Sequence, residues 1–218
     1  MRIEEAKWII DQINKLNISN VRLLDIGGST QNFRNDRQPF INDIIFTSLV
    51  KLNIEVVHSD IKNAEGVDFA GDILNKEFRE VIKKMSFPII LASNLLEHVR
   101  NLHAFCEALE YILPAQGILI ITVPNLYPYH RDPIDTLFRP DVKEVVSLFP
   151  GCDLKTGTIL ESSESHIKTL LKNPYNLLLT LKNWMIPRYG FREWKKRCND
   201  IPNIFKCYKM TCVVFQKR

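Results

Sequence analysis

Residues 21–30 combine an apolar run, an acid and a glycine turn, and no other segment constrains the fold as strongly. Leucyl and β-branched residues before Asp25 are typical of a buried strand, and the glycine pair that follows lets the backbone turn tightly and approach a ligand closely. A second apolar run, 54–59, leads directly to Asp60, whose carboxylate can accept two hydrogen bonds from ribose hydroxyls. Two strands that lead to acids predict one site for a nucleotide-like ligand.

The rest of the chain alternates between helical and strand-like apolar spacing. We expect helices over 3–16, 39–49, 77–85, 101–113 and 141–149, and strands over 21–26, 54–59, 67–72, 88–93, 117–123, 153–161 and 207–215. The run 117–123 is the most hydrophobic, so we expect it to be the central strand, with helices covering both of its faces. The alternation predicts an α/β fold with a mostly parallel sheet of seven strands.

The length of 218 residues suits one well-buried core, so we expect a single domain over 1–218. About 45 residues separate the last two expected strands, and their apolar spacing predicts a helical insertion at about 163–205. Open parallel sheets bind ligands beyond the carboxyl ends of their strands. If the strand at 153–161 is parallel, the insertion leaves the sheet on that side and can serve as a substrate cap.

Charge and cysteine content narrow the functional classes. Residues 161–218 contain 12 Lys or Arg against 4 Asp or Glu, whereas the rest of the chain contains 17 against 21. A solvated basic face is the leading interpretation and peripheral contact with a membrane surface an alternative; nucleic acid is not favoured, because no aromatic-rich RNA-reading motif is present. The five cysteines include no Cys-x-x-Cys pair and the acidic N-terminus lacks a secretory apolar run, so we expect a cytoplasmic protein.

Two further motifs point to a known family. Gly71-Asp72-Ile73 follows the third expected strand, and Asn94-Leu95-Leu96-Glu97-His98-Val99 follows the fourth. Together with the two strand-end acids and the glycine turn, these segments resemble class I S-adenosylmethionine-dependent methyltransferases over roughly residues 21–150. Ser29 departs from the family pattern, which commonly has a final glycine there.

The resemblance implies a Rossmann-like sheet whose last strand is antiparallel. It implies S-adenosylmethionine as the cofactor and S-adenosylhomocysteine as the product. It also implies that the cofactor is bound by Asp25, Gly27, Gly28, Asp60, Ile61, Asp72, Ile73, Asn94 and Leu95.

A narrower resemblance concerns the loop after the run 117–123. The segments Val123-Pro124-Asn125, 127–135 and Phe138-Arg139-Pro140 look like those of methyltransferases encoded among bacterial surface-polysaccharide genes. This likeness implies a small molecule or a glycan as the acceptor, methylated on a hydroxyl oxygen. The candidates for acceptor binding are Tyr129, Arg131, Asp135 and Arg139.

Methyl transfer to a hydroxyl is helped by a general base that removes the acceptor proton. His130 is the leading candidate because it lies near two carboxylates, Asp132 and Asp135, that can orient its ring, and His98 is the second candidate. Alternatively, His130 and Asp132 brace the proline-rich loop and His98 bonds only to backbone. The other histidines lack metal-ligand spacing, so no metal is predicted; they are His58, His103 and His166.

Other functional classes fit the sequence less well or stay open. A dinucleotide-binding dehydrogenase requires Gly-x-Gly-x-x-Gly with an acid about 20 residues later, whereas Asp60 follows Gly27 at a greater distance. A cofactor-binding module without catalysis stays open, because a fold does not guarantee turnover. An RNA methyltransferase also stays open, because the C-terminal region is basic.

Overall fold

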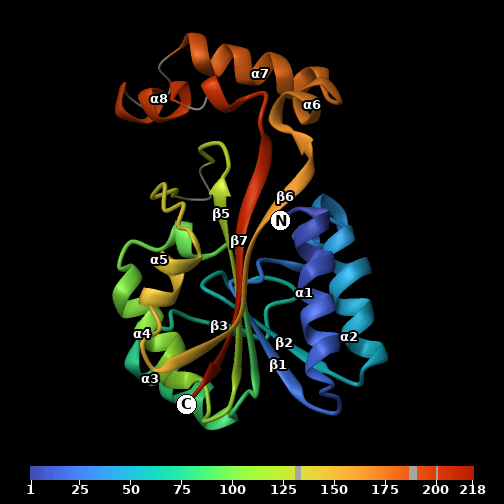
Figure 1. Ribbon diagram of the computed structural model, residues 1–218, viewed down its shortest axis with the longest axis vertical. Coiled ribbons are helices and arrows are strands. Elements are labelled where there is room, and N and C mark those ends of the chain that lie inside the picture. The colour runs from blue at the N-terminus through green and yellow to red at the C-terminus, as the bar shows by residue number, and fades with distance from the viewer. Residues whose placement is uncertain (131–133, 187–190, 200) are drawn as a thin grey trace.

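The computed structural model describes residues 1–130, 134–186, 191–199 and 201–218 (Figure 1). One sheet forms the centre of the described chain, with its strands in the order β3-β2-β1-β4-β5-β7-β6. The strands are β1 (Arg22–Ile26), β2 (Glu55–Asp60), β3 (Phe69–Ala70), β4 (Ile89–Ser93), β5 (Ile118–Leu126), β6 (Cys152–Ser165) and β7 (Cys207–Lys217). Neighbouring strands from β3 to β5 are parallel, whereas β7 is antiparallel to both β5 and β6. The expected mixed sheet with an antiparallel last strand is confirmed.

The strand order corrects one expectation. β4 occupies the middle of the sheet, and the run 117–123 forms β5 beside it, between β4 and β7. β5 is nevertheless buried on both faces, because Ile118 and Ile120 pack into one core and Leu119 and Ile121 into the other. Strong hydrophobicity marks a strand that is covered on two faces, a property that β4 and β5 share, so it does not identify the middle strand.

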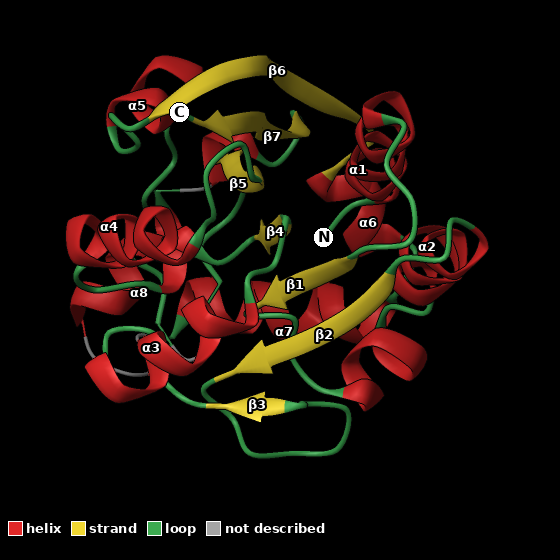
Figure 2. Cartoon of the chain, turned by 90° about the horizontal axis from the view of Figure 1, so that it is seen from below, coloured by secondary structure: helices red, strands yellow, loops and turns green. Residues whose placement is uncertain are grey.

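Helices cover both faces of the sheet, as Figure 2 shows from below. Those of the main body are α1 (Ile3–Leu16), α2 (Thr47–Lys51), α3 (Lys76–Met85), α4 (Leu102–Ile112) and α5 (Val142–Ser147). Ile9 of α1 and Leu49 of α2 belong to the core on one face, whereas Leu109 of α4 and Val145 of α5 belong to the core on the other. The two cores fix the sheet between its helical layers and leave the ends of the strands free to form a site.

Local structure follows the apolar spacing with two exceptions. The helix expected over 39–49 contains a π-helical turn, η2 (Asn42–Phe46), before α2, and a second such turn, η1 (Phe33–Arg37), precedes it. Apolar spacing does not distinguish one π-helical turn from an α-helical one. The strand expected over 67–72 is reduced to β3, because only Phe69 and Ala70 pair with β2.

The described part of the segment between β6 and β7 is mostly helical and lies beyond the carboxyl end of β5 (Figure 1). It comprises α6 (His166–Leu171), α7 (Pro174–Met185), α8 (Phe191–Cys198) and a short turn, η4 (Ile201–Asn203). β6 runs in the same direction as β5, since both are antiparallel to β7, so this segment leaves the sheet at its carboxyl edge. No helix in the described ranges is long and apolar enough to cross a membrane.

Candidate active site

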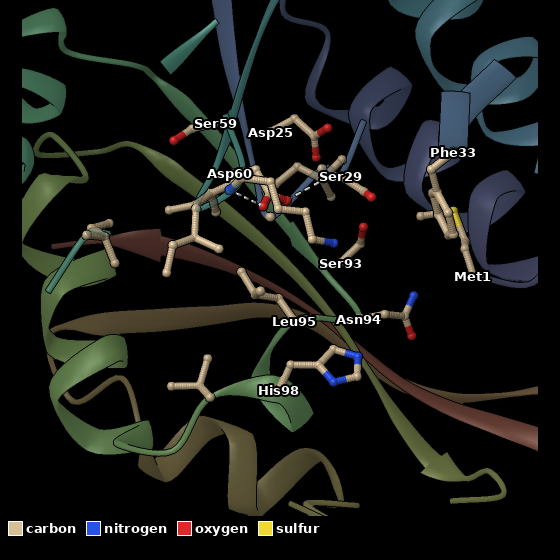
Figure 3. Close-up of a pocket in the computed structure, with 18 of the residues that line it drawn as sticks. Met1, Asp25, Ser29, Phe33, Ser59, Asp60, Ser93, Asn94, Leu95 and His98 are labelled. Atoms are coloured by element: carbon tan, nitrogen blue, oxygen red, sulfur yellow. Dashed lines mark hydrogen bonds between the residues drawn. The ribbon is translucent and has the colours of Figure 1, made fainter. Parts of the chain in front are cut away.

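A cavity of about 660 Å³ opens where β1, β2, β4 and β5 end (Figure 3). This volume lies within the range of ligand pockets, and the carboxyl edge of an open parallel sheet is where such pockets form. The structure brings all nine predicted cofactor-binding residues to this one cavity. They are Asp25, Gly27, Gly28, Asp60, Ile61, Asp72, Ile73, Asn94 and Leu95.

The glycine turn and Asp60 form one wall of the cavity. Gly27 has a φ of +73°, a conformation that side chains rarely adopt, and its N–H donates to the Ser59 carbonyl at 2.7 Å. The Asp60 carboxylate accepts the N–H of Ser29 on one oxygen at 2.9 Å and the N–H of Lys62 on the other at 3.0 Å. A carboxylate oxygen accepts two hydrogen bonds, so each oxygen of Asp60 can accept one more from a ligand hydroxyl.

The Asp25 side chain is covered by the glycine turn at Gly28. Asp25 is 2% exposed, and its Oδ2 is 2.8 Å from Nδ1 of His58. A Cβ atom on Gly28 would lie 2.0 Å from that same oxygen, so the turn closes over Asp25 only because residue 28 has no side chain. Asp25 therefore supports the turn together with His58, for which no role was predicted.

Arg34 joins the glycine turn to the loop after β2. Its side chain is buried and donates to the carbonyls of Gly28 at 2.9 Å, Ser29 at 2.7 Å and Gly66 at 2.6 Å. Three carbonyls converging on one guanidinium fix the backbone that lines the cavity. No sequence motif identifies Arg34, because its partners are backbone atoms that the fold brings together.

Asn94 is placed by a buried acid from the other end of the chain. Asn94 follows β4 with a φ of 48°, and its side-chain nitrogen donates to Glu5 of α1 at 2.5 Å. The Thr122 hydroxyl of β5 donates to the same Glu5 oxygen at 2.5 Å, and Glu5 is fully buried. One signal was available in the sequence: Glu5 precedes Ile9 by four residues, which places a charge on the apolar face of α1.

The remaining predicted cofactor residues line the neighbouring wall. The Asp72 carboxylate accepts the N–H of Leu74 at 2.9 Å, and Ile73 is buried beside it. Leu95 approaches the open side of Gly27, where an added Cβ would lie 2.7 Å from the leucine methyls. Ile61 is 71% exposed and lies at the cavity rim.

Two histidines line the other end of the cavity. The His98 and His130 rings are 5.1 Å apart and nearly perpendicular. Nδ1 of His98 lies 2.5 Å from the Ile134 carbonyl, and Nδ1 of His130 lies 3.2 Å from the Pro128 carbonyl. Since a carbonyl only accepts, Nδ1 of each ring carries a proton, and in the neutral form of the ring Nε2 is the nitrogen with the lone pair. Burial lowers the pKa of His130, which favours the neutral form that a general base requires.

Asp135, one of the two carboxylates expected near His130, lies against its ring. Its Oδ2 lies 3.4 Å from Nδ1 of His130 and accepts the His130 backbone N–H at 3.0 Å. Burial acts to raise the pKa of Asp135, but hydrogen bonds from Arg139 and from the His130 backbone lower it overall, so the carboxylate is charged. Asp132 and Arg131 lie outside the described residues.

The predicted acceptor-binding residues are placed differently from expectation. Asp135 and Arg139 pair with each other, with two nitrogen–oxygen contacts of 2.7 and 3.1 Å, and neither lines the cavity. Tyr129 is 6% exposed, and its ring centroid lies 5.3 Å from the Lys196 ammonium and 5.4 Å from the Arg197 guanidinium carbon of α8. These three residues build the loop beside the cavity, because their polar groups already have partners within the protein.

Glu97 belongs to the motif 94–99 but had no predicted role of its own. It follows Leu96 in the turn η3 (Leu96–His98) and is fully buried, and neither carboxylate oxygen has a hydrogen-bond partner among the described residues. One of these oxygens lies 3.7 Å from Nε2 of His98. Burial raises the pKa of Glu97 to about 8.

No protein-family model and no curated protein sequence matches the chain. Among solved structures, the [4+2]-cyclase SpnF aligns with a TM-score of 0.59 at 13% identity, over 97% of this chain and 80% of its own. Coclaurine N-methyltransferase bound to N-methylheliamine and SAH aligns with a TM-score of 0.57 at 14% identity, over 100% of this chain and 72% of its own. A SAM-dependent methyltransferase from Archaeoglobus fulgidus aligns with a TM-score of 0.52 at 12% identity, over 99% of this chain and 95% of its own. These similarities show that the chain has the Rossmann-like fold of class I methyltransferases.

Proposed function

We propose that the chain transfers a methyl group from S-adenosylmethionine to a hydroxyl oxygen of a small molecule or glycan. The observation that carries the proposal is the cavity itself. Asp60 and the glycine turn form one end of the cavity, and His98 and His130 form the other. One end suits a nucleoside, and the other suits an acceptor that must lose a proton.

The residues of the first end fit S-adenosylmethionine. The two free acceptor positions on Asp60 suit the two ribose hydroxyls, since one carboxylate can bind both. Asp72 and Ile73 would contact the adenine, with the acid on its amino group and the isoleucine against the ring. Asn94 and the turn at Gly27 would face the methionyl part.

The residues of the second end fit proton removal. When bound, the cofactor supplies a methyl group activated by a positively charged sulfur. His130 accepts the acceptor proton at Nε2, while Asp135 and the Pro128 carbonyl hold the ring by Nδ1. His98 lines the same end and fixes the loop through its bond to Ile134. The walls of the cavity keep water from the reacting atoms and hold the acceptor in line with the methyl group.

The acceptor is proposed to be a sugar, an activated sugar or a surface glycan precursor, handled in the cytoplasm. The support is the resemblance of the loop 123–140 to methyltransferases of surface-polysaccharide gene clusters. The basic helical segment after β6 lies at the same carboxyl edge and would act as a substrate cap, with peripheral contact to a membrane as a second role. Nucleic acid is not proposed as the acceptor.

The direct test is a product assay. Purified protein is incubated with S-adenosylmethionine carrying a labelled methyl group and with panels of nucleotide sugars, surface glycans and RNA. We expect label in a nucleotide sugar or glycan, and a mass spectrum that places the added methyl on a hydroxyl. Labelled RNA, or cofactor binding without turnover on any acceptor, would contradict the proposal; the second result would identify a binding module. SpnF, which has this fold, is named as a [4+2]-cyclase and not as a methyltransferase, so the fold alone does not establish methyl transfer.

A further inference from the structure

We propose that Glu97, His98 and His130 form a binding site for one first-row divalent cation, represented by Zn²⁺, at the histidine end of the cavity. A ring nitrogen of each histidine and a carboxylate oxygen of Glu97 all lie within 4.8 Å of one another. Two imidazoles and one carboxylate are a common ligand set for such cations. Sequence spacing gave no sign of the site, because His130 comes from a different loop.

The three candidate ligand atoms would have to move only slightly closer together to bind one cation. Zn²⁺ binds nitrogen and oxygen ligands at about 2.0–2.2 Å, so tetrahedral ligands lie roughly 3.4 Å apart. The contact between Nε2 of His98 and Oε1 of Glu97 is already 3.7 Å. The widest separation, at most 4.8 Å, would close by a shift on the order of 1 Å.

Both histidines already have the partners that metal-binding histidines usually have. Such a histidine donates its second ring N–H to a backbone carbonyl or a carboxylate, which fixes the tautomer and the orientation of the ring. His98 has the Ile134 carbonyl at Nδ1, and His130 has the Pro128 carbonyl with Asp135 nearby. In the neutral form of each ring, Nε2 is therefore the nitrogen that can bind a cation.

Glu97 is the independent observation in favour of a cation. Its carboxylate is fully buried, and within the described ranges both oxygens lack a hydrogen-bond donor. Buried polar atoms are almost always satisfied, so a bare buried carboxylate calls for a partner. Arg139 is the nearby cation, but its guanidinium bonds to both oxygens of Asp135. A divalent cation between Glu97 and the two histidines would supply the missing partner.

The cavity would let a cation reach the site and would leave part of its coordination sphere free for other ligands. His98 and His130 line the cavity and Glu97 lies behind them, so a cation would enter from the cavity and keep its remaining coordination positions on that side. A bound cation would occupy the lone pair with which His130 accepts a proton. Cation binding and methyl transfer should therefore exclude each other; this consequence rests on the proposed function, whereas cation binding does not.

The test is a calorimetric titration of the chelator-treated full chain with Zn²⁺, alongside a separate titration with S-adenosylhomocysteine. We expect one Zn²⁺ per chain, with affinity reduced at least about 10-fold in Glu97→Gln and in His98→Ala. His103→Ala, an exposed histidine on α4, is the matched control and should bind Zn²⁺ normally. Co²⁺ bound at the same site should show no sulfur charge-transfer absorption, since cysteine is not among the ligands.

Three results would overturn the cation site. They are absence of Zn²⁺ binding, binding that Glu97→Gln leaves unchanged, and a cobalt spectrum with thiolate bands. Melting temperatures of the variants check that each one folds. If Zn²⁺ binds as expected but S-adenosylhomocysteine does not, the cation site stands and the proposed function fails. If both bind, saturating Zn²⁺ should slow hydroxyl methylation by about 100-fold or more, the contribution expected of a general base.

Discussion

Asp60→Ala should weaken binding of S-adenosylmethionine by at least about 100-fold. The variant removes a charged acceptor of two ribose hydrogen bonds, and hydrogen bonds to charged groups contribute roughly 1.5–3 kcal/mol each. A loss of about 1.4 kcal/mol corresponds to a tenfold change in affinity. The same substitution leaves the N–H groups of Ser29 and Lys62 without their acceptor, which loosens the turn that faces the ligand.

Isothermal titration calorimetry measures this effect directly. Asp60→Asn keeps the volume and one oxygen acceptor, so its affinity should lie between those of the unmodified chain and Asp60→Ala. Asp43→Asn is the matched control, because Asp43 is exposed on η2 and does not line the cavity. Unchanged affinity in a folded Asp60→Ala variant would mean that the ribose binds elsewhere.

His130→Ala should slow methyl transfer to a hydroxyl acceptor by about 100-fold or more while sparing cofactor affinity. A positioned general base contributes roughly 10²–10⁴ to the rate, and His130 is the cavity histidine that a carboxylate orients. The two effects separate because the proton is removed at the opposite end of the cavity from Asp60. Loss of both cofactor affinity and rate would indicate a structural role for the loop instead.

Rates under single-turnover conditions, with S-adenosylhomocysteine titrations in parallel, check this expectation. His103→Ala serves again as the control, since its imidazole lies outside the cavity. His130→Gln replaces the ring with a side chain that can hydrogen-bond but cannot take up the proton, so it should be as slow as His130→Ala. A folded His130→Ala variant with unaltered turnover would remove His130 from the mechanism.

The framework of the fold could be predicted from the sequence because it depends on local apolar spacing. The helix expected over 3–16 matches α1, and Asn101 caps α4 by accepting the Ala104 N–H at 3.4 Å. The predicted cofactor residues converge on one cavity because parallel strands present their carboxyl ends at one edge, so strand-end acids such as Asp25 and Asp60 meet there. Periodicity and topology were sufficient for the sheet and for the meeting of the strand-end acids, whereas the full set of candidate cofactor residues came from the resemblance to class I methyltransferases.

The remaining features depend on contacts between distant segments. Glu5 reaches Asn94 and Thr122 across the sheet. Glu97 and His130 meet only because the loop after β5 folds back onto η3, where Thr136 N–H donates to the Glu97 carbonyl at 2.9 Å. A single sequence carries no record of such partners. The middle strand was also misassigned, because hydrophobicity reports burial and not order within the sheet.

A crystal structure of the chain with S-adenosylhomocysteine tests the central claim most directly. We expect the ribose hydroxyls at the Asp60 carboxylate, the homocysteine part against the turn at Gly27, and the sulfur directed toward the end lined by His98 and His130. Ligand density at another surface, or a ligand in the cavity whose ribose does not contact Asp60, would contradict the account.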